Sequence, residues 1–103
     1  MAFEQYNESG LGQKYLGINL GHGAISVSIN LHRKFKDADW KRADVFYDKE
    51  ANQVKFVRNN AKGTYVISWS QSINSKLGRD VMPRGRYLLT DEQEDEFVFT
   101  KED

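Results

Sequence analysis

A short stretch of this chain recurs almost unchanged further along it. The segment SVSIN, at 26–30, is matched by SQSIN, at 70–74, so four of five letters agree at a separation of 44 residues. Such a recurrence arises either from a duplicated unit or from a generic β domain in which Ser-Ile-Asn ends two unrelated strands. The choice constrains the fold strongly, because a duplication requires two units that pack as a pair.

A second match keeps the order and nearly the spacing of the first. Sliding the chain by 43 residues places Val54 on Phe97 and, two residues further on, phenylalanine on phenylalanine. In both copies these residues follow a polar turn, DKEAN in the first and DEQED in the second. We therefore predict two tandem repeats, at 15–58 and 63–100.

Each repeat has the pattern of a strand, a short helical segment and a β-hairpin. In the first repeat Ile25, Val27 and Ile29 alternate with polar residues, as in a half-buried strand. Leu31 and Phe35 then stand four apart, which suits one helical turn. Two apolar arms around the polar turn complete the pattern of a hairpin.

These patterns predict a mainly β fold, in which two tandem strand–short helix–β-hairpin units pack as a pseudo-twofold barrel or sandwich. A unit of roughly 40 residues closes no core alone, whereas two units bury their apolar arms and cover the hairpin edges. We expect one β domain at 15–103, preceded by a flexible lead-in at 1–14.

Composition narrows the functional classes. The 103 residues include no cysteine, which excludes disulfide scaffolds, thiolate zinc sites and cysteine nucleophiles. With only His22 and His32 besides, we expect no metal site, no cofactor and no catalytic activity. No apolar run approaches ~18 residues and the start lacks a signal-peptide pattern, so we expect a cytoplasmic protein without a membrane segment.

The net charge is zero, but the charges are unevenly distributed. Residues 1–90 hold 14 Lys and Arg against 8 Asp and Glu, whereas residues 91–103 hold one Lys against seven acids. A basic body with an acidic end is typical of accessory proteins that bind nucleic acids. The alternative is an acidic surface turn that offsets a mildly basic surface.

In both repeats the positive charge concentrates in the connector between strand and hairpin. Lys and Arg neutralise phosphates, and a tryptophan can stack on an unpaired base. The predicted nucleic-acid-binding residues are Arg33, Lys34, Lys36, Trp40, Lys41 and Arg42 in the first connector and Lys76, Arg79, Arg84 and Arg86 in the second. If a twofold relates the connectors, both face one way, as binding to a duplex requires.

Two alternatives remain open for these connectors. In one, the first connector is a solvated helical turn whose Trp40 packs in the core. The other concerns the kind of nucleic acid: exposed Trp40, Tyr65 and Trp69 favour single strands, whereas buried aromatics with exposed connector arginines favour a duplex.

The order of strand, short helical segment, loop and hairpin resembles the AbrB/MazE-type swapped-hairpin domain. The segments VSINLHRKF and ADVFYDKEANQVKFV look like one copy, and QSINSKLGRDVMPRGRYLLTDEQEDEFVF looks like a second, so the resemblance covers 24–99. It implies a β-barrel built by two units, and DNA binding in transcription control or in an antitoxin. Proteins of that family generally dimerise to bring two units together, whereas this chain would supply both.

From these observations we predict a small non-enzymatic DNA-binding protein of bacterial or bacteriophage type. It would act in transcription regulation, or as an accessory in replication or recombination, on single- or double-stranded DNA. The alternative is a protein–protein interaction module, such as a phage inhibitor or anti-defence factor, that uses the acidic segment 91–96 and the hairpin edges. A homodimer is a further expectation.

Overall fold

The structure is a computed structural model that describes residues 16–67 and 71–102. The predicted lead-in at 1–14 and Trp69 lie outside the described residues. No helix in the described part of the chain is long and apolar enough to cross a membrane.

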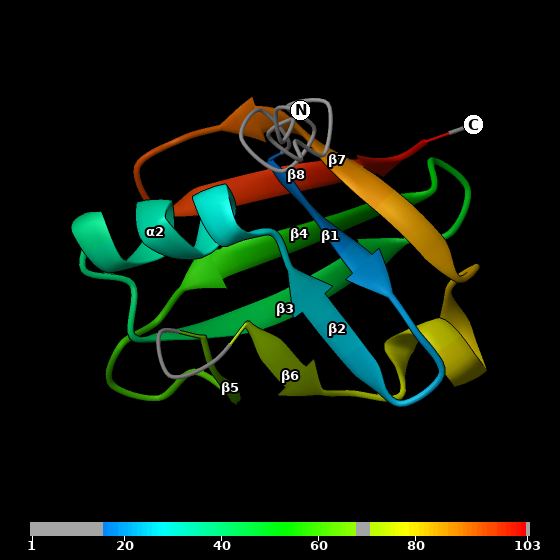
Figure 1. The fold of residues 1–103 in the computed structure, drawn as a ribbon, viewed down its shortest axis with the longest axis horizontal. Helices are drawn as coiled ribbons and strands as arrows, with labels where there is room; N and C mark the ends of the chain where they lie inside the picture. The colour runs from blue at the N-terminus through cyan, green and yellow to red at the C-terminus, as the bar shows by residue number, and fades with distance from the viewer. Residues whose placement is uncertain (1–15, 68–70, 103) are drawn as a thin grey trace, which may run out of the picture.

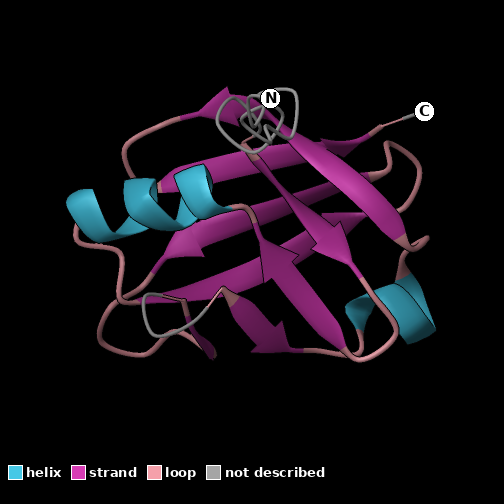
Figure 2. Ribbon diagram, viewed as in Figure 1, coloured by secondary structure: helices cyan, strands magenta, loops and turns pink. Residues whose placement is uncertain are grey.

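The fold is mainly β, as predicted, and its strands form one antiparallel sheet that curves into a nearly closed barrel (Figures 1 and 2). The strand order is β5-β3-β4-β8-β7-β1-β2-β6. The described elements are β1 (Gly17–Leu20), β2 (Ala24–Val27), α2 (Ile29–Asp37), β3 (Arg42–Asp48), β4 (Gln53–Arg58), β5 (Tyr65–Val66), β6 (Ser72–Asn74), the π-helical turn η1 (Leu77–Val81), β7 (Gly85–Glu92) and β8 (Glu96–Lys101).

The two edge strands of this sheet, β5 and β6, follow one another in the chain. Just after β5, the amide of Ile67 donates to the carbonyl of Lys41 at 3.1 Å. Just before β6, the carbonyl of Gln71 accepts from the amide of Val27 at 2.7 Å. The sheet edges are therefore held near each other, which leaves little free edge for pairing with another chain.

Aromatic side chains fill one end of the barrel. Trp40 is fully buried, and its ring centroid lies 4.9 Å from that of Phe35 and 4.7 Å from that of Phe97. Phe56 and Phe99 meet edge to face on the neighbouring strands β4 and β8, with centroids 5.3 Å apart. Such contacts add to the hydrophobic gain from burial. Helix α2 covers this end of the sheet (Figure 1).

Helix α2 is longer than the single turn that the sequence predicts. Ser28 is its N-cap, and the Ser28 side chain accepts from the amide of Leu31 at 3.3 Å. Leu31 and Phe35 are the buried residues of the helix, since positions four apart share one helical face. The helix ends before Asp39, whose φ of 59° is typical of a residue just past a C-terminus.

The capping by Ser28 corrects the prediction drawn from the SVSIN repeat. The letters align Ser28 with Ser72, but Ser28 caps a helix whereas Ser72 lies within strand β6. Ile29, expected to point inward from a strand, starts α2 and is 45% exposed. In the second half, Lys76 is the N-cap of η1, and Ser75 just before it accepts from the amide of Leu77 at 3.1 Å.

The 43-residue match of the hairpins, by contrast, coincides with the strand pairing. Strands β4 and β8 are antiparallel neighbours, in which Val54 is opposite Phe99 and Phe56 is opposite Phe97. The shift of 43 residues places Val54 on Phe97 and Phe56 on Phe99. If the two hairpins exchanged places, the same two residue pairs would therefore form.

Two backbone hydrogen bonds follow the same symmetry. The amide of Arg58 donates to the carbonyl of Asp95 at 2.8 Å, and that of Lys101 donates to the carbonyl of Asn52 at 2.9 Å. A shift of 43 residues places Arg58, the first donor, on Lys101, the second donor. The same shift places Asn52, the second acceptor, on Asp95, the first acceptor. A duplicated unit would produce this arrangement, but the duplication itself stays a prediction.

Candidate nucleic-acid interface

The two basic connectors lie at opposite ends of the barrel (Figure 1). The first contains helix α2 and the second contains η1, and the strands β1, β2 and β6 run between them in this view. The connectors therefore do not form one contiguous patch. A nucleic acid that touches both must span the molecule.

Three cations on α2 differ in their surroundings. Arg33 and Lys36 are exposed, and neither forms an ion pair with another described residue. Lys34 is more enclosed, and its ammonium lies 2.8 Å from a carboxylate oxygen of Glu92. Arg33 and Lys36 are therefore the α2 side chains that remain open to a phosphate.

Trp40 does not belong to this surface. Its side chain is 0% exposed, between Phe35 and Phe97. A buried ring offers no face to a base, so the prediction that Trp40 contacts nucleic acid is wrong, and the alternative of a core tryptophan is confirmed. The apolar side chains of α2 draw Trp40 inward, because the chain turns back onto the helix directly after Asp39.

The last two cations of the first connector have local structural partners. The Nε of Arg42 donates to the carbonyl of Gly63 at 2.8 Å, which anchors the loop before β5. Lys41 is exposed, with its ammonium 3.8 Å from a carboxylate oxygen of Asp39. Such an exposed pair is weak, so Lys41 stays available whereas Arg42 is engaged.

The cations of the second connector also comprise exposed side chains without an ion pair and side chains that pair with an acid. Lys76 and Arg84 are exposed and form no ion pair within the described residues. Arg79 pairs with the adjacent Asp80 at 3.1 Å, and Arg86 lies 3.6 Å from a carboxylate oxygen of Glu102. Each connector therefore offers at least two cations that no described acid neutralises.

The acidic segment 91–96 comprises the end of β7, the turn at 93–95 and the first residue of β8, so it lies at the tip of a hairpin as the pattern predicts. This turn lies beside α2, where Glu92 pairs with Lys34 and Asp95 pairs with Arg58. An open hollow of about 370 Å³ lies between turn and helix. Glu92 thus neutralises Lys34 of the first connector, whereas the paired cations of the second connector, Arg79 and Arg86, are held by Asp80 and Glu102.

Asp44, at the start of β3, organises the loop that precedes β5. The amide group of Asn59 donates to its carboxylate at 3.0 Å, and the backbone amide and hydroxyl of Thr64 donate at 3.1 and 3.2 Å. The hydrogen bond from Asn59, together with those from Thr64, lowers the pKa of Asp44 below its ordinary value of 3.8. Asp44 therefore holds a structural role next to Arg42.

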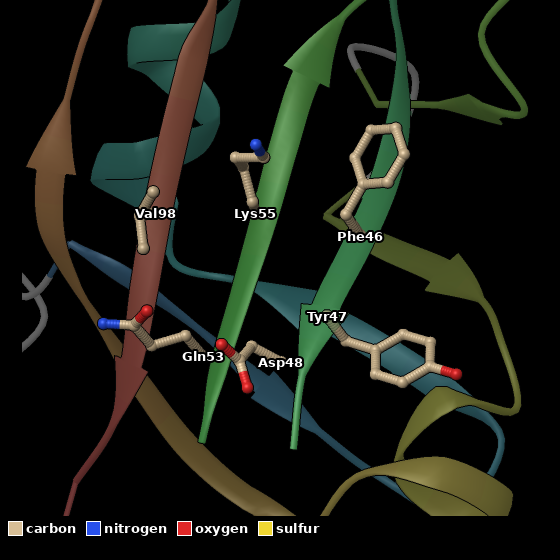
Figure 3. Close-up of a pocket in the computed structure, with 6 residues that line it drawn as sticks. All are labelled: Phe46, Tyr47, Asp48, Gln53, Lys55 and Val98. Carbon is tan, nitrogen blue, oxygen red and sulfur yellow. The ribbon is translucent and has the colours of Figure 1, made fainter. Parts of the chain in front are cut away.

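Strand β3 carries two exposed aromatic residues that the sequence analysis did not single out. Phe46 is 51% exposed on the outside of the barrel, opposite Lys55 of β4. Tyr47 is 53% exposed, but it is opposite the buried Val54 and its ring points away from Lys55 (Figure 3). The apolar run of β3 was interpreted as one arm buried in the core. Alternation along the strand is the available signal, since Phe46 falls on the opposite face from the core residues Ala43 and Val45.

Comparisons of the chain with models of protein families, with curated proteins and with solved structures gave no match. The resemblance to the AbrB/MazE-type domain therefore stays a prediction. Within the described ranges, no three His, Asp or Glu side chains converge as a metal site would require.

Proposed function

We propose that this chain is a small non-enzymatic protein that binds DNA through its two connectors. The observation that carries the proposal is the pair of unneutralised cations at each end of the barrel: Arg33 and Lys36 on α2, and Lys76 and Arg84 around η1. The zero net charge of the chain does not reveal these cations, because many of the acidic residues are concentrated in the segment 91–96.

Phosphate binding explains why such cations remain unpaired. Lys and Arg side chains gain free energy by displacing the counterions that surround a polyphosphate, so their contribution depends on salt. Their flexible side chains suit contacts that position a strand without recognising its sequence. Regulation of transcription, or an accessory role in replication or recombination, is the cellular function that we propose for such binding.

A protein-binding module that uses the acidic segment 91–96 is less well supported. Glu92 and Asp95 already pair with Lys34 and Arg58, so a basic partner would have to displace these intramolecular ion pairs. The sheet edges also offer a partner protein little free strand to pair with, since the edge strands β5 and β6 are held near each other.

The experiment measures the affinity for fluorescent single-stranded and duplex oligonucleotides over roughly 50 to 200 mM salt. The variants are R33A/K36A, K76A/R84A and the matched control K49A/K62A, which removes two exposed lysines outside the connectors. We expect each connector variant to bind about tenfold or more weakly and to show a shallower salt dependence. The log–log slope should fall by roughly 0.7 to 0.9 for each cation that no longer meets a phosphate. The control should change little.

Two outcomes would overturn the proposal. One is the absence of binding to either oligonucleotide at low salt. The other is binding that falls equally in the control and in both connector variants, since net charge alone would then account for it.

A further inference from the structure

The outer face of β3, β4 and β8 carries a shallow hollow of about 310 Å³ on the side of the hairpin turn. Figure 3 shows its lining side chains, which come from three neighbouring strands. They are Phe46, Tyr47, Asp48, Gln53, Lys55 and Val98. The hollow contains aromatic rings, a cation and an amide, which is a different chemistry from that of the connectors.

The Phe46 ring in this hollow is available to a ligand, whereas Tyr47 borders the hollow and its ring points away from Lys55 (Figure 3). Phe46 and Tyr47 are about half exposed, whereas Tyr87, Phe56 and Phe99 are buried. Among the described residues, neither exposed ring stacks on another aromatic side chain, and the Tyr47 hydroxyl has no hydrogen bond. Exposed aromatics of this kind mark surfaces that bind a partner.

The ammonium of Lys55 lies over the Phe46 ring. Lys55 is the cross-strand neighbour of Phe46, and its ammonium lies 5.6 Å from the centroid of the Phe46 ring. No described acid forms an ion pair with Lys55. Because a lysine over an aromatic ring can also reach a phosphate when a base stacks on that ring, this pair suits a nucleotide.

The polar neighbours fit the same ligand. Gln53 donates from Nε2 to the hydroxyl of Thr100 at 3.2 Å, which holds the side chain in place and leaves its carbonyl oxygen as an acceptor. Asp48 accepts from the amides of Glu50 and Ala51 at 3.0 and 3.2 Å, so its charge stabilises the hairpin turn. An amide oxygen beside an aromatic ring can accept from the amino or imino group of a base.

We propose that Phe46 and Lys55 form a base-stacking site for an unpaired nucleotide, so that the DNA bound is single-stranded. This inference rests on the proposed function and decides between its two kinds of DNA. Bases within a duplex are stacked on each other and cannot lay a face on a protein ring, whereas unpaired bases can. We define Phe46 and Lys55 as the aromatic site.

The position of the aromatic site suits a strand that also contacts the second connector. The turn between β3 and β4 lies at the same end of the barrel as η1 (Figure 1). Lys76 and Arg84, the unneutralised cations of that connector, flank η1. A single strand can therefore contact these cations and the aromatic site at one end of the molecule.

The test compares F46A with two matched controls: Y47A, which removes the neighbouring exposed ring, and V66A, which truncates another exposed apolar side chain, on β5. Binding is measured to a single-stranded oligothymidine and to a duplex of equal length. We expect F46A to lose about tenfold or more in affinity for the single strand, with duplex affinity and both controls unchanged. The variant F46W should retain single-strand binding, because stacking needs the ring and not the particular residue.

A second measurement locates the base directly. Ultraviolet crosslinking of an oligonucleotide that contains 5-iodouracil should attach the base to Phe46, as mapped by mass spectrometry. If F46A binds the single strand normally and the crosslink maps elsewhere, the aromatic site is refuted while the connector proposal stands. If the wild-type protein binds no oligonucleotide at low salt, both proposals fail. Capture of peptides but not of DNA by this surface would also refute the aromatic site.

Discussion

The ammonium of Lys34 lies 2.8 Å from a carboxylate oxygen of Glu92, and this ion pair joins helix α2 to the turn between β7 and β8. Both side chains are partly open to solvent, so the pair contributes little to stability, of the order of 0 to 1 kcal/mol. Its consequence concerns binding, because Glu92 occupies a place where a phosphate oxygen would meet Lys34.

The first prediction is that E92Q binds DNA more tightly than the wild-type protein. The substitution removes a negative charge beside α2 and frees Lys34, so we expect affinity to rise about two- to tenfold at low salt and less at high salt. Fluorescence anisotropy with the oligonucleotides used for the connector variants measures the change. The double variant K34Q/E92Q is the control, and a gain that persists in it would show that Lys34 is not the residue released.

The second prediction separates core from surface at Trp40. We expect W40F to lower the free energy of unfolding by roughly 1 to 3 kcal/mol, because the smaller ring leaves space between Phe35 and Phe97. DNA affinity, measured where the variant is folded, should stay unchanged. Urea unfolding gives the first quantity and anisotropy the second. A large loss of affinity with unchanged stability would contradict the buried position.

The third prediction concerns a glycine that no side chain can replace. A Cβ at Gly63 would lie 2.6 Å from the backbone nitrogen of Ala43 and 2.7 Å from the carbonyl oxygen of Asn59. Because both neighbours are backbone, we expect G63A to destabilise the protein by about 1 to 3 kcal/mol or more. Thermal unfolding should show the loss. The control is G23A, where a Cβ meets no atom within 4 Å, and a similar loss there would refute the explanation.

The fourth prediction concerns pH. The pKa of Asp44 is lowered in the folded protein by its hydrogen bonds with Asn59 and Thr64. Its stabilising contribution is therefore complete above the ordinary value of 3.8 and is lost as pH falls through the lower folded-state value. We expect D44N to be less stable than wild type at neutral pH, with a smaller difference near about pH 3. Urea midpoints at both pH values test this, and a difference independent of pH would contradict it.

Much of the secondary structure could be predicted from local patterns. The two apolar arms in 43–57 and the polar turn between them identified the first hairpin, and β3 and β4 lie there. The segment 24–30 was assigned too much strand, because Ser28 suits both a strand end and a helix N-cap. The burial of Leu31 and Phe35 against the sheet, a tertiary interaction, favours the helix that begins after Ser28.

The candidate site divides in the same way. The sequence located the cations in two connectors, and it located the acids in a hairpin turn. It could not show that Glu92 reaches Lys34, since that ion pair depends on the pairing of β8 with β4 and of β7 with β1. For the same reason, Trp40 was assigned to the surface and Phe46 to the core.

The sequence by itself determined that this chain is mainly β, with two hairpins and two basic connectors, because alternation, turn residues and charge runs act over a few neighbouring residues. Only the tertiary structure decided which aromatic rings are buried and which cations remain open. Those properties depend on the order of strands around the barrel, and pairings between distant segments set that order.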